Sequence, residues 1–175
     1  MTKDPRRHDG DLSLSSQLEM TKQITIYFAG AISGGRGDVA HYRAIVAALE
    51  RDGHRVLAGA VAAEHVGAAG EPLESSAIFE RDMQWIAHAD VLVAEVSMPS
   101  TGVGYEIATA RYLHDIPVIC LYRPAYTKRC TAMVGGDAGI ELIEYDDPAE
   151  MLSRLRAALQ KYSTDGVGCS RRTPA

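Results

Sequence analysis

The 175-residue sequence has few aromatic residues (6%), only three cysteines and no excess of basic side chains. Its 18 Lys and Arg residues against 23 Asp and Glu residues give a formal charge of −5. This balance argues against a duplex nucleic-acid binder, which normally carries a basic face. Cys120, Cys130 and Cys169 show neither metal-ligand spacing nor an obvious pairing. Cys120 lies in an apolar, strand-like run, and we expect it to be a buried thiol.

Long apolar runs are also missing. No stretch approaches the about 20 residues needed to cross a bilayer, and residues 1–22 lack the hydrophobic segment of a secretory signal. The six histidines form no HxxxH or HxH set, so we predict no metal site. Together these absences predict a cytoplasmic protein without a membrane or nucleic-acid partner.

Hydrophobic residues make up 46% of the chain and charged residues 23%, as in an ordinary globular protein. We predict one folded domain over residues 23–162. Residues 1–22 are polar, mixed in charge and contain Ser and Gly, which predicts a disordered N-terminal extension. Residues 163–175 are rich in Gly, Ser and Arg and predict a flexible tail.

Within this domain, apolar strand-like segments alternate with helix-like ones. Strands are predicted at residues 24–29, 54–58, 91–96, 117–122 and 140–145, and helices at 38–52, 61–69, 75–88, 103–114 and 148–162. Such alternation implies parallel strands joined by right-handed crossovers. The fold class is therefore predicted to be α/β: a Rossmann-like, doubly wound, five-stranded parallel sheet of order 2-1-3-4-5, with helices on both faces.

Two glycine-rich loops are expected to meet in this fold. Ligands of a 2-1-3-4-5 sheet bind at the carboxyl ends of strands one and three, where residues 30–37 and 97–104 lie. The second loop leads from a strand into a helix, and free N–H groups at a helix start can hold a phosphate. The first loop has neither a Walker nor a dinucleotide-binding pattern, so a plain strand-to-helix turn is an alternative there.

Five polar side chains near these loops could carry chemistry. Glu106 is expected in the first turn of its helix, where the helix dipole favours the ionised form of a nucleophile or base; the alternative is a simple first-turn charge. Asp82 could be a second catalytic carboxylate or part of a solvated face. Glu95 could hydrogen-bond at the crevice or mark an exposed strand end, and Tyr27 could face the crevice or pack elsewhere. Ser100 lacks the setting of a hydrolase nucleophile and is better interpreted as a phosphate ligand.

Several sequence blocks, in order, resemble those of the 2′-deoxynucleoside 5′-phosphate N-hydrolases, within the nucleoside 2-deoxyribosyltransferase-like superfamily. The likeness runs from about residue 24 to residue 150. The blocks are YFAGAISGGR (27–36), DMQW (82–85), ADVLVAEV (89–96), PSTGVGYE (99–106), LYRP (121–124) and TAM (131–133).

The resemblance implies hydrolysis of the N-glycosidic bond of a (2′-deoxy)nucleoside 5′-monophosphate, which gives the free base and (2-deoxy)ribose 5-phosphate. By analogy, Glu106 attacks the anomeric carbon, Asp82 assists departure of the base, and Tyr27 positions Glu106 and the sugar. A retaining reaction of this kind uses two carboxylates about 5 Å apart. Neither a metal nor an organic cofactor is required.

The resemblance also implies a homodimer with shared active sites. The implied phosphate-site residues are Gly30, Ile32, Ser33, Gly34, Arg36, Ser100, Gly102 and the partner subunit's Thr131. Vertebrate members carry an Arg where this chain has Ser33, and Arg36 is the nearest candidate to replace it.

Three other functions stay open at this point. A nucleoside 2-deoxyribosyltransferase would pass the same glycosyl intermediate to a second base, but it acts on unphosphorylated nucleosides. A ribonucleotide hydrolase of the cytidylate type would use the same residues. A non-catalytic nucleotide-binding module would have no need of the carboxylates. The base preference is not predicted, although Ala31, Ile32, His41, Tyr42 and residues 61–65 could influence it.

Overall fold

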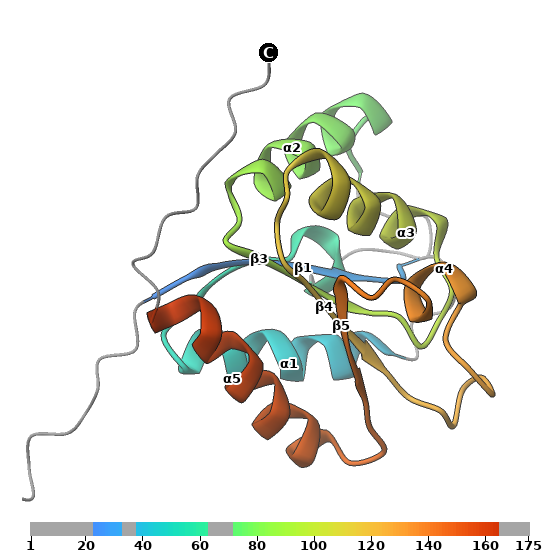
Figure 1. Cartoon of the computed structure of the whole chain (residues 1–175). Helices are drawn as coiled ribbons and strands as arrows, with labels where there is room; N and C mark the ends of the chain where they lie inside the picture. The colour runs from blue at the N-terminus through green and yellow to red at the C-terminus, as the bar shows by residue number, and fades with distance from the viewer. Residues whose placement is uncertain (1–22, 33–37, 63–71, 165–175) are drawn as a thin grey trace, which may run out of the picture.

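Five strands form a single parallel sheet in the order β2-β1-β3-β4-β5 (Figure 1). The computed structural model describes residues 23–32, 38–62 and 72–164. The strands are β1 (Thr25–Gly30), β2 (Arg55–Leu57), β3 (Val91–Glu95), β4 (Val118–Tyr122) and β5 (Ile140–Glu144). The predicted fold class and strand order are confirmed.

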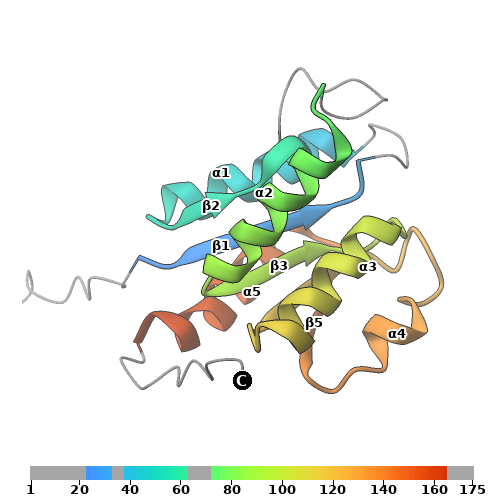
Figure 2. The same ribbon diagram turned by 90° about the horizontal axis from the view of Figure 1, so that it is seen from above.

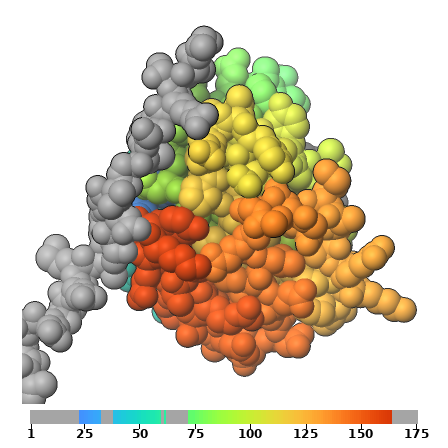
Figure 3. Space-filling view, in the orientation of Figure 1, coloured from blue at the N-terminus to red at the C-terminus, as the bar shows by residue number. Residues whose placement is uncertain are grey.

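The helices cover both faces of this sheet. They are α1 (Val39–Arg51), a 3-10 turn η2 (Gly59–Ala62), α2 (Ser75–His88), α3 (Thr101–Ala108), its π-helical continuation η3 (Thr109–Leu113), α4 (Ala132–Gly135) and α5 (Pro148–Thr164). Helices α1 and α5 lie on one face, and α2 and α3 lie on the other (Figures 1 and 2). In the space-filling view, segments from the C-terminal half cover most of the visible side (Figure 3).

Each strand contributes alternate side chains to two separate cores. On β1, Ile26 and Phe28 pack in the core beneath α1 and α5, whereas Tyr27 and Ala29 pack toward α2 and α3. Side chains alternate in this way along any strand, and a parallel sheet with both faces covered reads as a nearly continuous apolar run. The alternation therefore settles that Tyr27 belongs to the α2/α3 face.

Some predicted boundaries differ from the structure. Helix α2 has the predicted bounds, but a four-residue 3-10 turn lies where the helix 61–69 was expected to begin, and residues 63–71 lie outside the described part. Helix α4 was not predicted, because four residues are too few to show a helical period. Helix α5 runs to Thr164, and Ser163, assigned to the flexible tail, is buried in it. The predicted extension 1–22 and residues 165–175 lie outside the described residues.

Candidate functional site

A cavity of about 240 Å³ opens at the carboxyl end of β1, between the segment that follows β2 and helices α2 and α3. It is lined by Tyr27, Gly30, Ile32, Ala58, Gly59, Val61, Ile78, Arg81, Asp82, Ser100, Gly102, Val103 and Glu106. Seven of the residues predicted for the site thus lie together. The predicted phosphate residues Ser33, Gly34 and Arg36 lie outside the described residues.

Tyr27 and Glu106 form a hydrogen-bonded pair at this cavity. The Tyr27 hydroxyl donates to Oε1 of Glu106 over 2.8 Å, and the Tyr27 side chain is buried in the core under α2 and α3. Burial, followed by the negative charge of Glu106, raises the pKa of Tyr27 well above its usual range. The phenol therefore stays protonated and acts as a fixed donor to the carboxylate.

Glu106 differs from the expectation in its position and its charge. Helix α3 begins at Thr101, so Glu106 is in its second turn, not the first. Burial raises the pKa of Glu106 to about 7, and the charge of Asp82 adds to the rise, while the hydrogen bond from Tyr27 opposes it. The prediction that Glu106 lies in the first turn was wrong, and the dipole, which acts mainly within that turn, does not hold its pKa at a low value.

Asp82 reaches the cavity from α2 and forms an ion pair there. The distance from Nη2 of Arg81 to Oδ1 of Asp82 is 2.9 Å, with about a fifth of each side chain exposed (23% and 17%). The Arg81 guanidinium also lies over the ring of Trp85, 4.6 Å from its centroid. The structure thus places Asp82 at the cavity beside Glu106, where its charge influences that carboxyl.

The start of α3 forms one wall of the cavity. Ser100 occupies the N-cap position, and its Oγ accepts a hydrogen bond from the backbone N–H of Val103 over 3.4 Å. A second cavity of about 300 Å³ shares Ser100 and Val103 and is lined by Thr131 and Val134 on its other side. Within the chain, Thr131 therefore lies next to the start of α3 without lining the cavity of Glu106.

Gly30 ends β1 where the chain passes close to two side chains. A Cβ atom at this position would lie 3.0 Å from Cγ1 of Val61 and 3.2 Å from the Tyr42 ring. A side chain at this position would be tight against both neighbours, and glycine allows the close approach without displacing them. Of the residues that we expected to influence base preference, Ile32 and Val61 line the cavity, whereas His41 is hydrogen-bonded to Tyr145 on the other side of the sheet.

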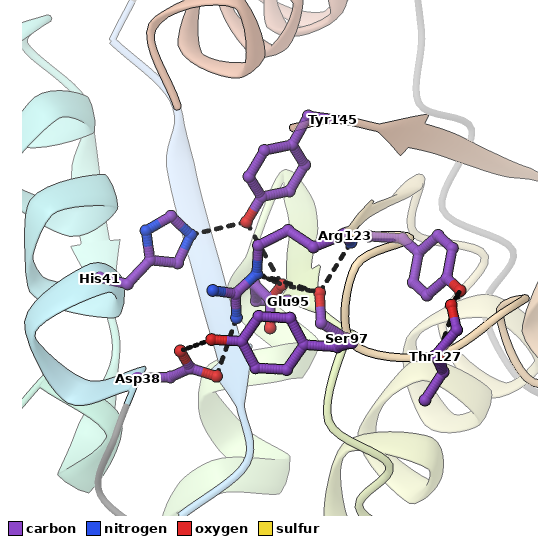
Figure 4. Close-up of polar contacts among 9 residues, drawn as sticks. Asp38, His41, Glu95, Ser97, Arg123, Thr127 and Tyr145 are labelled. Atoms are coloured by element: carbon purple, nitrogen blue, oxygen red, sulfur yellow. Dashed lines mark hydrogen bonds and ion pairs between the residues drawn. The ribbon is translucent and has the colours of Figure 1, made fainter. Parts of the chain in front are cut away.

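Glu95 takes part in a second polar group, on the α1/α5 side of the sheet (Figure 4). Its side chain is fully buried, so of the two alternatives for Glu95 the exposed strand end is excluded. Oε1 accepts hydrogen bonds from the Ser97 hydroxyl and, over 3.3 Å, from Nε of Arg123. Glu95 does not line the cavity, and the two carboxylates that do are Asp82 and Glu106.

Arg81, Ile78 and Arg123 are among the residues of these two sites that sequence reasoning missed. Arg81 directly precedes Asp82, but adjacent residues on a helix point in different directions, so the sequence did not indicate that both side chains reach the cavity. Ile78 lies one turn before Asp82 and looked like an ordinary apolar helix position. The partner of Glu95 could have been anticipated, because a carboxylate in an apolar strand needs a cation or donor, and Arg123 follows the neighbouring strand.

Within residues 23–32, 38–62 and 72–164, no group of three or more His, Cys, Asp or Glu side chains could hold a metal ion. No helix in this part of the chain has the length and apolar character needed to span a membrane.

The chain is similar to several known proteins. Residues 26–141 match the family model described as nucleoside 2-deoxyribosyltransferase. The chain is 40% identical over 140 residues to a 5-hydroxymethyl-dUMP N-hydrolase of Danio rerio, a match covering 79% of this chain and 95% of that one. The corresponding Homo sapiens protein is 40% identical over 139 residues, covering 78% of each chain.

Two solved structures share the fold. BlsM superposes with a TM-score of 0.64 at 21% identity, covering 88% of this chain and 99% of that one. The CMP N-glycosidase BcmB of Clostridium botulinum gives a TM-score of 0.56 at 18% identity, covering 77% and 99%.

Proposed function

Because the chain belongs to the nucleoside 2-deoxyribosyltransferase family, we propose that it hydrolyses the N-glycosidic bond of 2′-deoxynucleoside 5′-monophosphates. The products are the free base and 2-deoxyribose 5-phosphate. The observation that carries the proposal is the Tyr27–Glu106 hydrogen bond in a cavity that Asp82 also lines. The N-hydrolase names of the relatives at 40% identity support a phosphorylated substrate and water as the acceptor.

In this reaction, Glu106 is the nucleophile. Tyr27 holds Oε1, and Oε2 of the ionised carboxylate attacks C1′ of the sugar as the bond to the base nitrogen breaks. The bonding electron pair leaves with the base, and Asp82 orients the base or assists its protonation. Water then attacks C1′ of the glycosyl ester and gives up one proton, which balances the proton taken up by the released base. This step restores the Glu106 carboxylate and retains the configuration.

The 5′-phosphate is proposed to bind at the start of α3, near the end of β1. Ser100 and Gly102 supply the helix start, and Gly30 and Ile32 line the same cavity. Ser33, Gly34 and Arg36 complete this set in our proposal. Binding energy from a phosphate remote from C1′ helps to position the sugar for attack.

We further propose that the protein is a cytoplasmic homodimer in which the partner subunit's Thr131 contributes to the phosphate site. Large apolar side chains exposed on α2, α3 and their neighbours support a protein interface on this side. They are Phe79 (51%), Tyr105 (57%), Tyr112 (74%), Leu113 (72%) and Met133 (87%). Phe79 of α2 and Tyr105 of α3 pack edge to face, with centroids 6.2 Å apart, and so form one continuous patch.

A substrate panel tests the proposed function. The purified protein is incubated with deoxy- and ribonucleoside 5′-monophosphates and the matching nucleosides, and base release is followed by chromatography. We expect release from the phosphorylated deoxynucleosides, loss of release in Glu106→Gln, and unchanged release in Glu50→Gln, which alters an exposed α1 side chain. Base exchange between free nucleosides would indicate a transferase, and release from ribonucleotides alone a cytidylate-type hydrolase. Nucleotide binding without release would indicate a binding module.

A further inference from the structure

The polar group around Glu95 connects four chain segments at the carboxyl edge of the sheet (Figure 4). Arg123, which directly follows β4, donates from Nη2 to Oδ2 of Asp38 over 2.8 Å and from Nε to Oε1 of Glu95 over 3.3 Å. Tyr145, which directly follows β5, donates to the same Glu95 oxygen over 3.3 Å and is 2.6 Å from Nε2 of His41. The segments that leave β3, β4 and β5 are thus fixed to the start of α1.

The side chain of Ser97 bonds to the segment after β4, beyond the last backbone hydrogen bond between β3 and β4. The last backbone bond between these strands runs from the N–H of Val96 to the carbonyl of Leu121, over 2.9 Å. Two residues further on, the N–H of Arg123 donates to Oγ of Ser97 over 2.8 Å, and this hydroxyl donates in turn to Glu95. A side chain therefore replaces the backbone ladder and satisfies a donor that would otherwise be orphaned. Ser97 is fully buried.

The side chain of Asp38 binds the polar group around Glu95 and does not cap helix α1. Asp38 is the N-cap residue of α1, yet its side chain makes no cap hydrogen bond. Its two carboxylate oxygens instead accept from Arg123 and, over 3.0 Å, from the Tyr126 hydroxyl. Burial opposes ionisation of Asp38, but the bond and charge of Arg123 outweigh it and lower its pKa. A local preference overridden in this way is common near functional sites.

We propose that Ser97 and Arg123 are positioning residues that hold the Ser100–Gly102 helix start where it can bind the 5′-phosphate. Neither side chain lines the cavity, so both act through the backbone. Ser97 lies three residues before the N-cap Ser100, and its anchoring limits how far this short connection can shift. The inference rests on the proposed function, because it assigns the phosphate to the start of α3.

The test compares two buried serines. Ser97→Ala removes the anchoring hydroxyl but leaves Arg123 and its two carboxylate partners, Asp38 and Glu95, in place. Ser163→Ala is the matched control, since the buried Ser163 hydroxyl donates only to the carbonyl of Leu159 in α5, over 3.3 Å. We expect Ser97→Ala to raise KM for the deoxynucleotide about tenfold, as for one lost hydrogen bond. We expect kcat and its pH profile to change little, because Glu106 lies on the α2/α3 face of the sheet and the polar group around Glu95 lies on the α1/α5 face.

Titration with 2-deoxyribose 5-phosphate tests the inference without turnover. Its Kd should rise about tenfold in Ser97→Ala and stay unchanged in Ser163→Ala. Equal Kd values in both variants, with only a lower melting temperature, would overturn the inference. If Ser97→Ala fails to fold, Arg123→Lys is tested in its place. The Kd should again rise, because one ammonium cannot reproduce the several directed bonds of the guanidinium. An unchanged Kd would overturn the inference. A wild-type protein that binds the sugar phosphate but releases no base would refute the proposed function instead.

Discussion

Replacing Glu106 by glutamine should stabilise the protein above neutral pH while abolishing base release. Burial raises the pKa of Glu106 from 4.5 to about 7. The folded state therefore binds more protons than the unfolded state between these two values, and the free energy of unfolding falls as pH rises through that window. A displacement of this size corresponds to at most about 3 kcal/mol above pH 7. Glutamine has the shape of the protonated carboxyl and does not carry this pH-dependent penalty.

The assay is urea denaturation of the wild type and Glu106→Gln at pH 4.5 and pH 8. We expect similar free energies of unfolding at pH 4.5 and an advantage for the variant of up to about 3 kcal/mol at pH 8. Base release should fall by at least about 1000-fold, as for a removed nucleophile. Glu50→Gln changes the net charge equally at an exposed site and should show no such advantage. The same difference between wild type and Glu106→Gln at both pH values would refute the reasoning.

Three further variants test the neighbours of this carboxyl. Tyr27→Phe removes a hydrogen bond that lowers the pKa of Glu106, so the acid limb of kcat/KM should move to higher pH; a downward shift would contradict this. Asp82→Asn removes a charge that raises the same pKa, so the limb should move to lower pH. Its kcat should also fall about 10²–10⁴-fold, and an unchanged kcat would exclude the catalytic role. Gly30→Ala places a Cβ 3.0 Å from Cγ1 of Val61, which should lower the free energy of unfolding by about 1–3 kcal/mol in denaturant.

The fold could be predicted because its signals are local and repeated. Five apolar runs alternate with helical segments, and the connection rules leave few ways to arrange them. The start of α3 and the end of β1 could be placed together for the same reason, since the strand order brings both to one edge. The strand order therefore placed Ser100 and Gly102 beside the end of β1, whereas Asp82 and Tyr27 were assigned to the site of Glu106 by the family resemblance.

Other properties depend on contacts that no local pattern encodes. The face to which Tyr27 points follows from its register with Leu57 and Leu92, and a one-residue slip would reverse it. The pKa of Glu106 depends on how deeply the helix packs, which composition does not reveal. Arg123 is 28 residues from Glu95 in sequence, so only the assembled sheet brings the two together.

Glu95 and Glu106 are both buried to a large extent, but their carboxylates have different surroundings. Oε1 of Glu95 accepts from a guanidinium at 3.3 Å and from two hydroxyl donors, which offset part of the cost of burial. Oε2 has no hydrogen-bond partner among the described residues, and burial still raises the pKa of Glu95. Glu106 receives a phenol hydroxyl at 2.8 Å and lies near the charge of a second carboxylate. In the proposed reaction, positive charge develops on the sugar ring at the transition state. A carboxylate whose charge is poorly compensated in the free protein gains most from that cation, so the instability tested by Glu106→Gln is also the proposed source of its reactivity.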